Sequence, residues 1–240
     1  MIGLESTIEY GGPREQMVSE LARETPASWL SPVELDWVRG LPNERRRDDW
    51  LGGRWCVKRL VLRLASLGLQ PGIGRELEPL DITVQSVNAR GRSTRPTVYI
   101  AGVASAFAVS IAHSDQQVFA TAAIRPRIRV GIDVVDGAGR WDALAAAWFT
   151  PCERALVGRN TDPLDMLRVW SAKEACYKAI VSPQPFDPRS IEIDMRSMSE
   201  GEARIASDAF ARAGSRTAAI RWRRTPEGLR AVAFSQEFPP

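Results

Sequence analysis

The apolar residues of this chain recur with helical spacing in some segments and form short β-branched runs in others, which predicts an α+β protein. The longest helical pattern covers residues 44–67, and residues 1–30 are expected to be a loosely organised lead-in that contains one helix. Helices are predicted at 15–24, from 32, at 44–67, at 141–148, from 151 and at about 163–181. Strands are predicted at 80–88, 97–100, 106–112, 117–124, 129–135, 190–194, 203–206, 217–223 and 230–235, with a basic turn at 91–96.

Each half of the chain is therefore predicted to contain helices that pack on a small antiparallel sheet. The order of elements is similar in the two halves, although no sequence repeat is apparent. We expect two domains, an N-terminal half at 1–128 and a C-terminal half at 129–240. A chain of 240 residues is long enough for two such units, each with its own core.

The composition is that of a soluble globular protein, with 44% hydrophobic and 25% charged residues. No apolar run reaches the length of a membrane span, and the N-terminus has no export signal, so a cytoplasmic protein is expected. The three cysteines, Cys56, Cys152 and Cys176, form no C-x-x-C pair. Neither a disulfide framework nor a zinc site is expected, and each cysteine is interpreted as a small buried residue.

Arginine clusters at 45–47 and 221–224 dominate the charge pattern, although the net charge is only +3. Such clusters favour anionic partners, among them nucleotides, nucleic acids and acidic proteins. The alternative is a solvated basic surface without a partner.

The helix predicted at about 163–181 has two distinct faces. One is a core stripe made by Val169, Ala172, Cys176 and Ile180. On a different face Trp170, Glu174 and Lys178 are spaced by four residues and flanked by Lys173 and Tyr177. That face is either the wall of a cleft or an ordinary surface with a Glu174–Lys178 ion pair.

Asp133 lies in a run of Val, Ile and Gly, where a buried carboxylate needs a cation or hydrogen-bond donors. Asp133 and Glu174 could together bind Mg²⁺, which uses one or two protein carboxylates with phosphate oxygens and water. Alternatively, Asp133 caps a turn with Gly137. His113, the only histidine, is either structural or functional, and its neighbour Ser114 points to the opposite face of a strand, which excludes a serine–histidine nucleophile.

In this order, three motifs resemble the 4′-phosphopantetheinyl transferases, specifically the larger pseudodimeric type that activates surfactin synthetase. The motifs are Ser110-Ile111-Ala112-His113-Ser114, Gly131-Ile132-Asp133 and Trp170-Ser171-Ala172-Lys173-Glu174-Ala175-x-x-Lys178, and the resemblance extends over roughly residues 30–235. It implies a pseudodimer of two similar α+β halves with the active site at their junction. It also implies transfer of phosphopantetheine from coenzyme A to a serine of an acidic acyl or peptidyl carrier protein, with release of adenosine 3′,5′-bisphosphate.

The resemblance also implies residue roles. Asp133 and Glu174 would hold Mg²⁺ or Mn²⁺, and Glu174 would take the serine proton. Lys173 and Lys178 would stabilise charge on the phosphates. His113 would contact the 3′-phosphate of coenzyme A, and Arg95, next to Pro96, would replace a Lys-Pro element of the family near the nucleotide. A member of the 45–47 cluster such as Arg45 would also contact coenzyme A.

The sequence departs from the family pattern in two regions. Val135 lies where many members have a second acid, and Glu34 and Trp37 lie where some relatives have lysines. Two rival functions are considered. The first is a degenerate relative that binds coenzyme A or a carrier protein without turnover, which Val135 favours. The second is a nucleic-acid-binding module that uses the arginine clusters. The second is disfavoured because the arginine clusters lack interleaved aromatic residues. We expect a monomer that binds neither nucleic acid nor a membrane.

Overall fold

A computed structural model describes residues 7–69, 76–87, 93–124, 127–137, 141–159, 162–180, 185–205 and 217–236. The protein has an α+β fold with small antiparallel sheets. The chain divides into two compact units, Met1–Pro126 and Arg127–Pro240. In the described parts of the chain, every helix is too short or too polar to cross a membrane.

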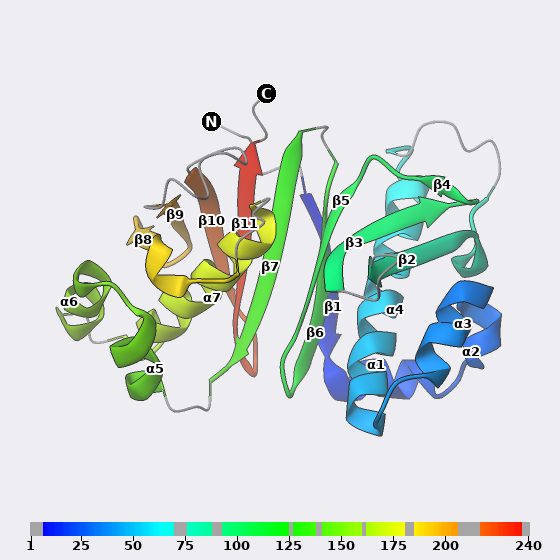
Figure 1. Ribbon diagram of the computed structural model, residues 1–240, viewed down its shortest axis with the longest axis horizontal. Coiled ribbons are helices and arrows are strands. Elements are labelled where there is room, and N and C mark those ends of the chain that lie inside the picture. The colour runs from blue at the N-terminus through cyan, green and yellow to red at the C-terminus, as the bar shows by residue number, and fades with distance from the viewer. Residues whose placement is uncertain are drawn as a thin grey trace. The chain divides into compact units, whose positions relative to one another are not determined.

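The N-terminal unit contains four helices and six strands among its described residues. The helices are α1 (Arg14–Leu21), α2 (Pro26–Trp29), α3 (Pro32–Arg39) and α4 (Glu44–Ser66). The strands are β1 (Thr7–Pro13), β2 (Ile82–Val87), β3 (Ser93–Ile100), β4 (Val103–Ala104), β5 (Ala108–His113) and β6 (Gln117–Ala123). They form two antiparallel sheets with the orders β1-β6-β5 and β2-β3-β4, and α4 packs against β6 and β1 (Figure 1).

Local capping explains where α3 and α4 begin. The Ser31 N–H donates to Glu34 Oε2 at 2.9 Å in a capping box, with Pro32 at the first helical position. The Asn43 side chain accepts from the Arg46 N–H at 2.8 Å and so caps α4. The predicted helices at these positions are confirmed.

The C-terminal unit consists of three helices and five strands in its described part. The helices are α5 (Trp141–Trp148), α6 (Pro151–Arg159) and α7 (Asp165–Ala179). The strands are β7 (Ile128–Asp136), β8 (Ile191–Met195), β9 (Glu200–Ile205), β10 (Thr217–Arg224) and β11 (Gly228–Gln236). They form one antiparallel sheet with the order β7-β11-β10-β9-β8, and α7 packs against β7 and β11 (Figure 1).

The predicted core stripe of α7 is confirmed, because Val169, Ala172, Cys176 and Ile180 all lie in the hydrophobic core of this unit. Burial raises the pKa of the Cys176 thiol to about 12. Cys56 is buried as well, but Cys152 is exposed, so the interpretation of each cysteine as buried fails there. Cys152 lies in the first turn of α6.

Two predictions for the N-terminal unit were wrong. Residues 7–13 form strand β1, which pairs with β6, and are not part of a loose lead-in. Residues 93–96 of the predicted basic turn belong to β3, whereas 91 and 92 lie outside the described residues. In both segments, pairing with a neighbouring strand overrides weak local signals such as Gly11, Gly12 and Pro96.

The two units share an order of elements. In each, the first strand pairs with the last strand of the unit, β1 with β6 and β7 with β11. In each, the longest helix packs on that pair of strands and is followed by a 3₁₀ turn, Pro79–Asp81 or Pro188–Ser190, and then an antiparallel strand pair. The similar order predicted from the sequence is therefore present in the structure.

Candidate active site

Strand β7 and helix α7 approach each other closely at Gly131. A Cβ atom at this position would lie 1.9 Å from the Ala175 carbonyl oxygen and 2.6 Å from the Ala179 nitrogen, so no larger residue fits. Residues two apart in a strand point to the same face, so Asp133 faces α7 as Gly131 does. The glycine therefore allows the helix to bring its side chains against Asp133.

Asp133, Glu174 and Lys178 converge at this contact. Lys178 Nζ lies 2.7 Å from Asp133 Oδ1, 3.0 Å from the Ile132 carbonyl oxygen and 3.8 Å from Glu174 Oε2. The Asp133 side chain is only 8% exposed, whereas Glu174 and Lys178 are each 31% exposed. The cluster is thus anchored by a buried acid and can be reached from solvent through its other two members.

Asp133 lies three residues before the end of β7, in the middle of its pairing with β11. The Gly137 N–H bonds to the Glu227 carbonyl oxygen instead. The alternative role of Asp133 as a turn cap is therefore wrong.

The charges in this cluster are strongly coupled. Burial raises the pKa of Asp133, Lys178 lowers it, and the charge of Glu174 and a hydrogen bond with it raise it again, which leaves the pKa at about 7. Burial alone would lower the pKa of Lys178, but the attraction of Asp133 and Glu174 outweighs this effect and raises it. Two carboxyl groups thus share one region with a single ammonium group.

The two carboxyl groups fit a divalent cation of the kind that Mg²⁺ sites use, with phosphate and water oxygens completing the coordination. Burial is the largest cause of the raised pKa of Asp133, and a cation beside the carboxyl group would favour its charged form. Within the described residues, no group of three or more His, Cys, Asp or Glu side chains is placed to hold a metal ion. Val135, two residues beyond Asp133, is buried in the hydrophobic core and offers no ligand.

Lys173 does not belong to this cluster. Its side chain is fully buried, and its Nζ lies 2.8 Å from Glu153 Oε2 and donates to the carbonyl oxygens of Pro188 and Ile191. The predicted contact of Lys173 with phosphates is not supported, because oxygens of its own unit surround the ammonium group. Its observed role is to fix α7 to the start of α6 and to the 3₁₀ turn before β8.

The N-terminal unit contains the same arrangement around Lys58. Lys58 Nζ lies 2.7 Å from Glu34 Oε2 and donates to the carbonyl oxygens of Trp29, Pro79 and Ile82. Glu34 Oε1 accepts from the Val84 N–H, as Glu153 Oε1 accepts from the Ile193 N–H. The sequence carries a signal of this repeat, because Trp55-x-x-Lys58 matches Trp170-x-x-Lys173.

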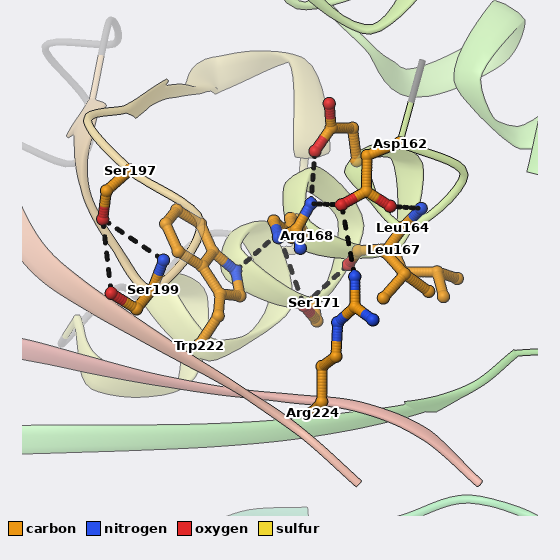
Figure 2. A network of polar contacts seen from close by, with 10 residues as sticks. Asp162, Leu164, Leu167, Arg168, Ser171, Ser197, Ser199, Trp222 and Arg224 are labelled. Atoms are coloured by element: carbon orange, nitrogen blue, oxygen red, sulfur yellow. Dashed lines mark hydrogen bonds and ion pairs between the residues drawn. The ribbon is translucent and has the colours of Figure 1, made fainter. Parts of the chain in front are cut away.

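A second network fixes the start of α7, the helix that carries Glu174 and Lys178. Figure 2 shows Asp162 accepting from the buried Arg168 at 2.9 Å and pairing with Arg224 of β10 at 3.4 Å. The indole N–H of Trp222 donates to the Arg168 carbonyl oxygen at 2.9 Å. These contacts join α7 to β10 and so help to hold the helix in its position on the sheet.

The other predicted ligand contacts lie in the N-terminal unit. His113 ends β5, and Asp115, two residues later, forms an ion pair with Arg45 in the first turn of α4. Arg45 and Asp115 are both highly exposed. Arg95 is half-buried in β3. The structure thus brings Arg45 to the turn that follows His113.

Part of the C-terminal unit is similar to a known superfamily. Residues 129–227 match the family model of the 4′-phosphopantetheinyl transferase superfamily. The matched segment includes Asp133, Glu174 and Lys178 and covers less than half of the chain. No curated protein matched the chain. The family match supports a transferase of this superfamily.

Proposed function

We propose that this protein transfers the 4′-phosphopantetheine group of coenzyme A to a serine hydroxyl of an apo acyl or peptidyl carrier protein. The serine oxygen forms a bond to the phosphorus that carries the pantetheine arm. The bond from that phosphorus to the rest of the nucleotide breaks, which releases adenosine 3′,5′-bisphosphate. The observation that supports this proposal is the convergence of Asp133, Glu174 and Lys178 inside the segment that matches the family.

The carboxyl pair has two roles in the proposal. Asp133 and Glu174 hold Mg²⁺, or Mn²⁺ in its place, which when bound supplies positive charge beside the diphosphate. Glu174 is the more exposed acid, so it also accepts the serine proton, directly or through a water molecule. Asp133 remains buried and fixes the position of the pair.

Lys178 stabilises negative charge on the transferred phosphoryl group and on the leaving group. Its ammonium group is already held at 2.7 Å from Asp133, and the raised pKa keeps it charged at neutral pH. Phosphoryl transfer depends on positioning and charge neutralisation more than on covalent chemistry. The ion pair of Lys178 and Asp133 supplies both, because it places a positive charge at a fixed position.

His113, Arg95 and Arg45 contact coenzyme A in this proposal, as the resemblance implies. Lys173 is omitted from the ligand contacts because it is buried in an ion pair. The excess of basic residues favours an acidic carrier protein as the second substrate. We further propose that the enzyme is of the pseudodimeric type, since both units contain the same order of elements and the same kind of buried ion pair. We also propose that it is monomeric and cytoplasmic.

The test is to incubate the protein with coenzyme A, MgCl₂ and several apo carrier proteins, and to measure the intact mass of each carrier. We expect a mass gain of one phosphopantetheine group, which a chelator abolishes and Mg²⁺ restores. Glu174→Gln should lose most of the transfer without loss of fold. Glu192→Gln is the matched control, because Glu192 is exposed on β8. Near-normal transfer by Glu174→Gln would contradict the assigned roles.

The second candidate is a relative that binds coenzyme A or carrier protein without turnover. The observation that favours it is Val135, which leaves the cluster with two acids. Coenzyme A binding by calorimetry, without a mass gain in any carrier, would support this candidate over the transferase.

A further inference from the structure

Lysine is rare in this chain, and each lysine lies against a carboxylate. Only three of the 32 lysine and arginine residues are lysines. Each of the three forms an ion pair with an acid at 2.7 or 2.8 Å and donates to at least one backbone carbonyl oxygen. An ammonium group is a compact point charge, so it can lie among several oxygen atoms much as a metal ion does.

Lys178 differs from the other two lysines in its exposure. The side chains of Lys58 and Lys173 are 1% and 0% exposed, so both are confined to their ion pairs. The Lys178 side chain is 31% exposed, although its partner Asp133 is only 8% exposed. An ammonium group that water already reaches can leave its partner at a smaller cost than a fully buried one. Lys178 is therefore the lysine that is able to move.

The oxygen atoms around the Lys178 ammonium group are also those that the proposed function assigns to a divalent cation. Its Nζ lies 2.7 Å from Asp133 Oδ1 and 3.8 Å from Glu174 Oε2. The Ile132 carbonyl oxygen lies 3.0 Å from the same nitrogen. Like charges repel strongly at such distances in a partly buried site. The ammonium group and a divalent cation must therefore compete for the carboxyl pair.

The packing of α7 on β7 fixes where the Lys178 side chain starts, but not where it ends. A Cβ atom at Gly131 would lie 2.9 Å from the Lys178 Cβ, so the lysine side chain begins directly over this glycine. The rest of the side chain is a flexible four-carbon stem. The ammonium group can therefore leave Asp133 and still remain close to the carboxyl pair, where it would meet a bound diphosphate.

We infer that Lys178 is the resident cation of the carboxyl pair in the ligand-free protein and that it leaves Asp133 when a divalent cation binds. The released ammonium group then pairs with the diphosphate of the substrate. The divalent cation and the diphosphate should therefore bind cooperatively, because each favours the lysine position that the other requires. This inference rests on the proposed function, which assigns both ligands to this cluster.

The first test measures Mn²⁺ binding by electron paramagnetic resonance, without coenzyme A or carrier protein. Lys178→Met should bind Mn²⁺ at least about tenfold more tightly than the wild type, because no ammonium group competes. The double variant Lys178→Met/Asp133→Asn should lose this tighter binding. Arg204→Gln is the matched control, since it removes a positive charge from an exposed side chain on β9, three strands from β7 in the same sheet. It should bind Mn²⁺ as the wild type does.

The second test uses the wild-type protein and the exposure of Lys178. The protein is acetylated with N-hydroxysuccinimide acetate, and peptide mass spectrometry compares the rate at Lys178 with that at the α-amino group of the chain. Saturating Mg²⁺ should accelerate acetylation of Lys178 at least about threefold, because the pairing with Asp133, which favours the unreactive charged form, is lost. Coenzyme A added with Mg²⁺ should slow it again. The buried Lys58 and Lys173 should stay unmodified.

Circular dichroism checks the fold of each variant, and if Lys178→Met does not fold, the acetylation rates of the wild type decide. A folded Lys178→Met that binds Mn²⁺ no more tightly than the wild type would overturn the inference, as would tighter binding that persists in the double variant. An acetylation rate at Lys178 that Mg²⁺ leaves unchanged or lowers would overturn it as well. A wild type that meets both expectations but modifies no carrier protein would contradict the proposed transfer and leave this role of Lys178 intact.

Discussion

Replacement of Lys173 by methionine tests whether this lysine is structural, as its contacts indicate, or binds phosphate, as its motif suggested. The substitution removes the ammonium group from Glu153, which is fully buried, and leaves the carbonyl oxygens of Pro188 and Ile191 without their donor. Removing one partner of a buried ion pair typically costs about 3–5 kcal/mol. We expect a loss of this size in the free energy of unfolding and a fall of at least about 1 M in the urea midpoint.

The assay combines urea unfolding, followed by circular dichroism, with calorimetry of coenzyme A binding to the folded fraction. The double variant Lys173→Met/Glu153→Gln should recover part of the lost stability, because it leaves no unpaired buried charge. Lys178→Met is the contrasting variant, since Lys178 is 31% exposed. It should weaken coenzyme A binding and transfer much more than it changes the urea midpoint.

A Lys173→Met protein with an unchanged urea midpoint and weakened coenzyme A binding would refute this reasoning. Such a result would mean that the ammonium group leaves Glu153 and reaches the ligand. Lys58→Met gives an internal comparison, because Lys58 makes the same kind of contacts with Glu34 and two carbonyl oxygens of a 3₁₀ turn and the strand after it. It should lower stability by a similar amount.

Three further predictions concern single residues. Gly131→Ala should cost about 3 kcal/mol or more in urea unfolding, because its Cβ would lie 1.9 Å from a backbone oxygen of α7; near-wild-type stability would contradict this packing. Asp133 has a pKa raised from 3.8 to about 7, so the stability it contributes as a neutral acid is complete below about pH 4 and lost as the pH rises through 7. In the metal-free protein the free energy of unfolding should therefore fall between pH 4 and 8, and Asp133→Asn should show a smaller fall, whereas parallel curves would argue against the shift. His113→Ala should raise the Michaelis constant for coenzyme A more than it lowers the turnover number, and an unchanged constant in steady-state assays would count against the contact.

The sequence predicted most helices because their signals are local. The capping box at Ser31 and Glu34 and the core stripe of α7 each depend on residues within a few turns of one another. Strand β1 was missed because Gly11, Gly12 and Pro13 argue against a strand, and only its pairing with β6 makes it one.

The site could be predicted only in part, because its geometry depends on contacts between distant residues. Helical spacing alone places Glu174 and Lys178 on one face, but Asp133 joins them only because Gly131 permits close packing. Lys173, next to Glu174 in sequence, points into the core toward Glu153. Helical periodicity does not show that the Lys173 side chain is buried while the Glu174 side chain is partly exposed. The repeat of Trp-x-x-Lys in both halves, in contrast, would have indicated a structural lysine.

The Trp-x-x-Lys repeat also distinguishes residues with a structural role from residues proposed to take part in the reaction. When Trp55-x-x-Lys58 is aligned with Trp170-x-x-Lys173, the buried lysine is the same in both units, but the next residue is Arg59 in one and Glu174 in the other. Arg59 lies over the Trp55 ring at 4.3 Å, and its guanidinium group has no oxygen that could bind a metal ion or accept a proton. The lysine–glutamate pair is therefore a requirement of the fold, present in each unit. The carboxyl pair lies on α7 and β7, so the proposed chemistry should require Glu174 and tolerate substitution of Arg59.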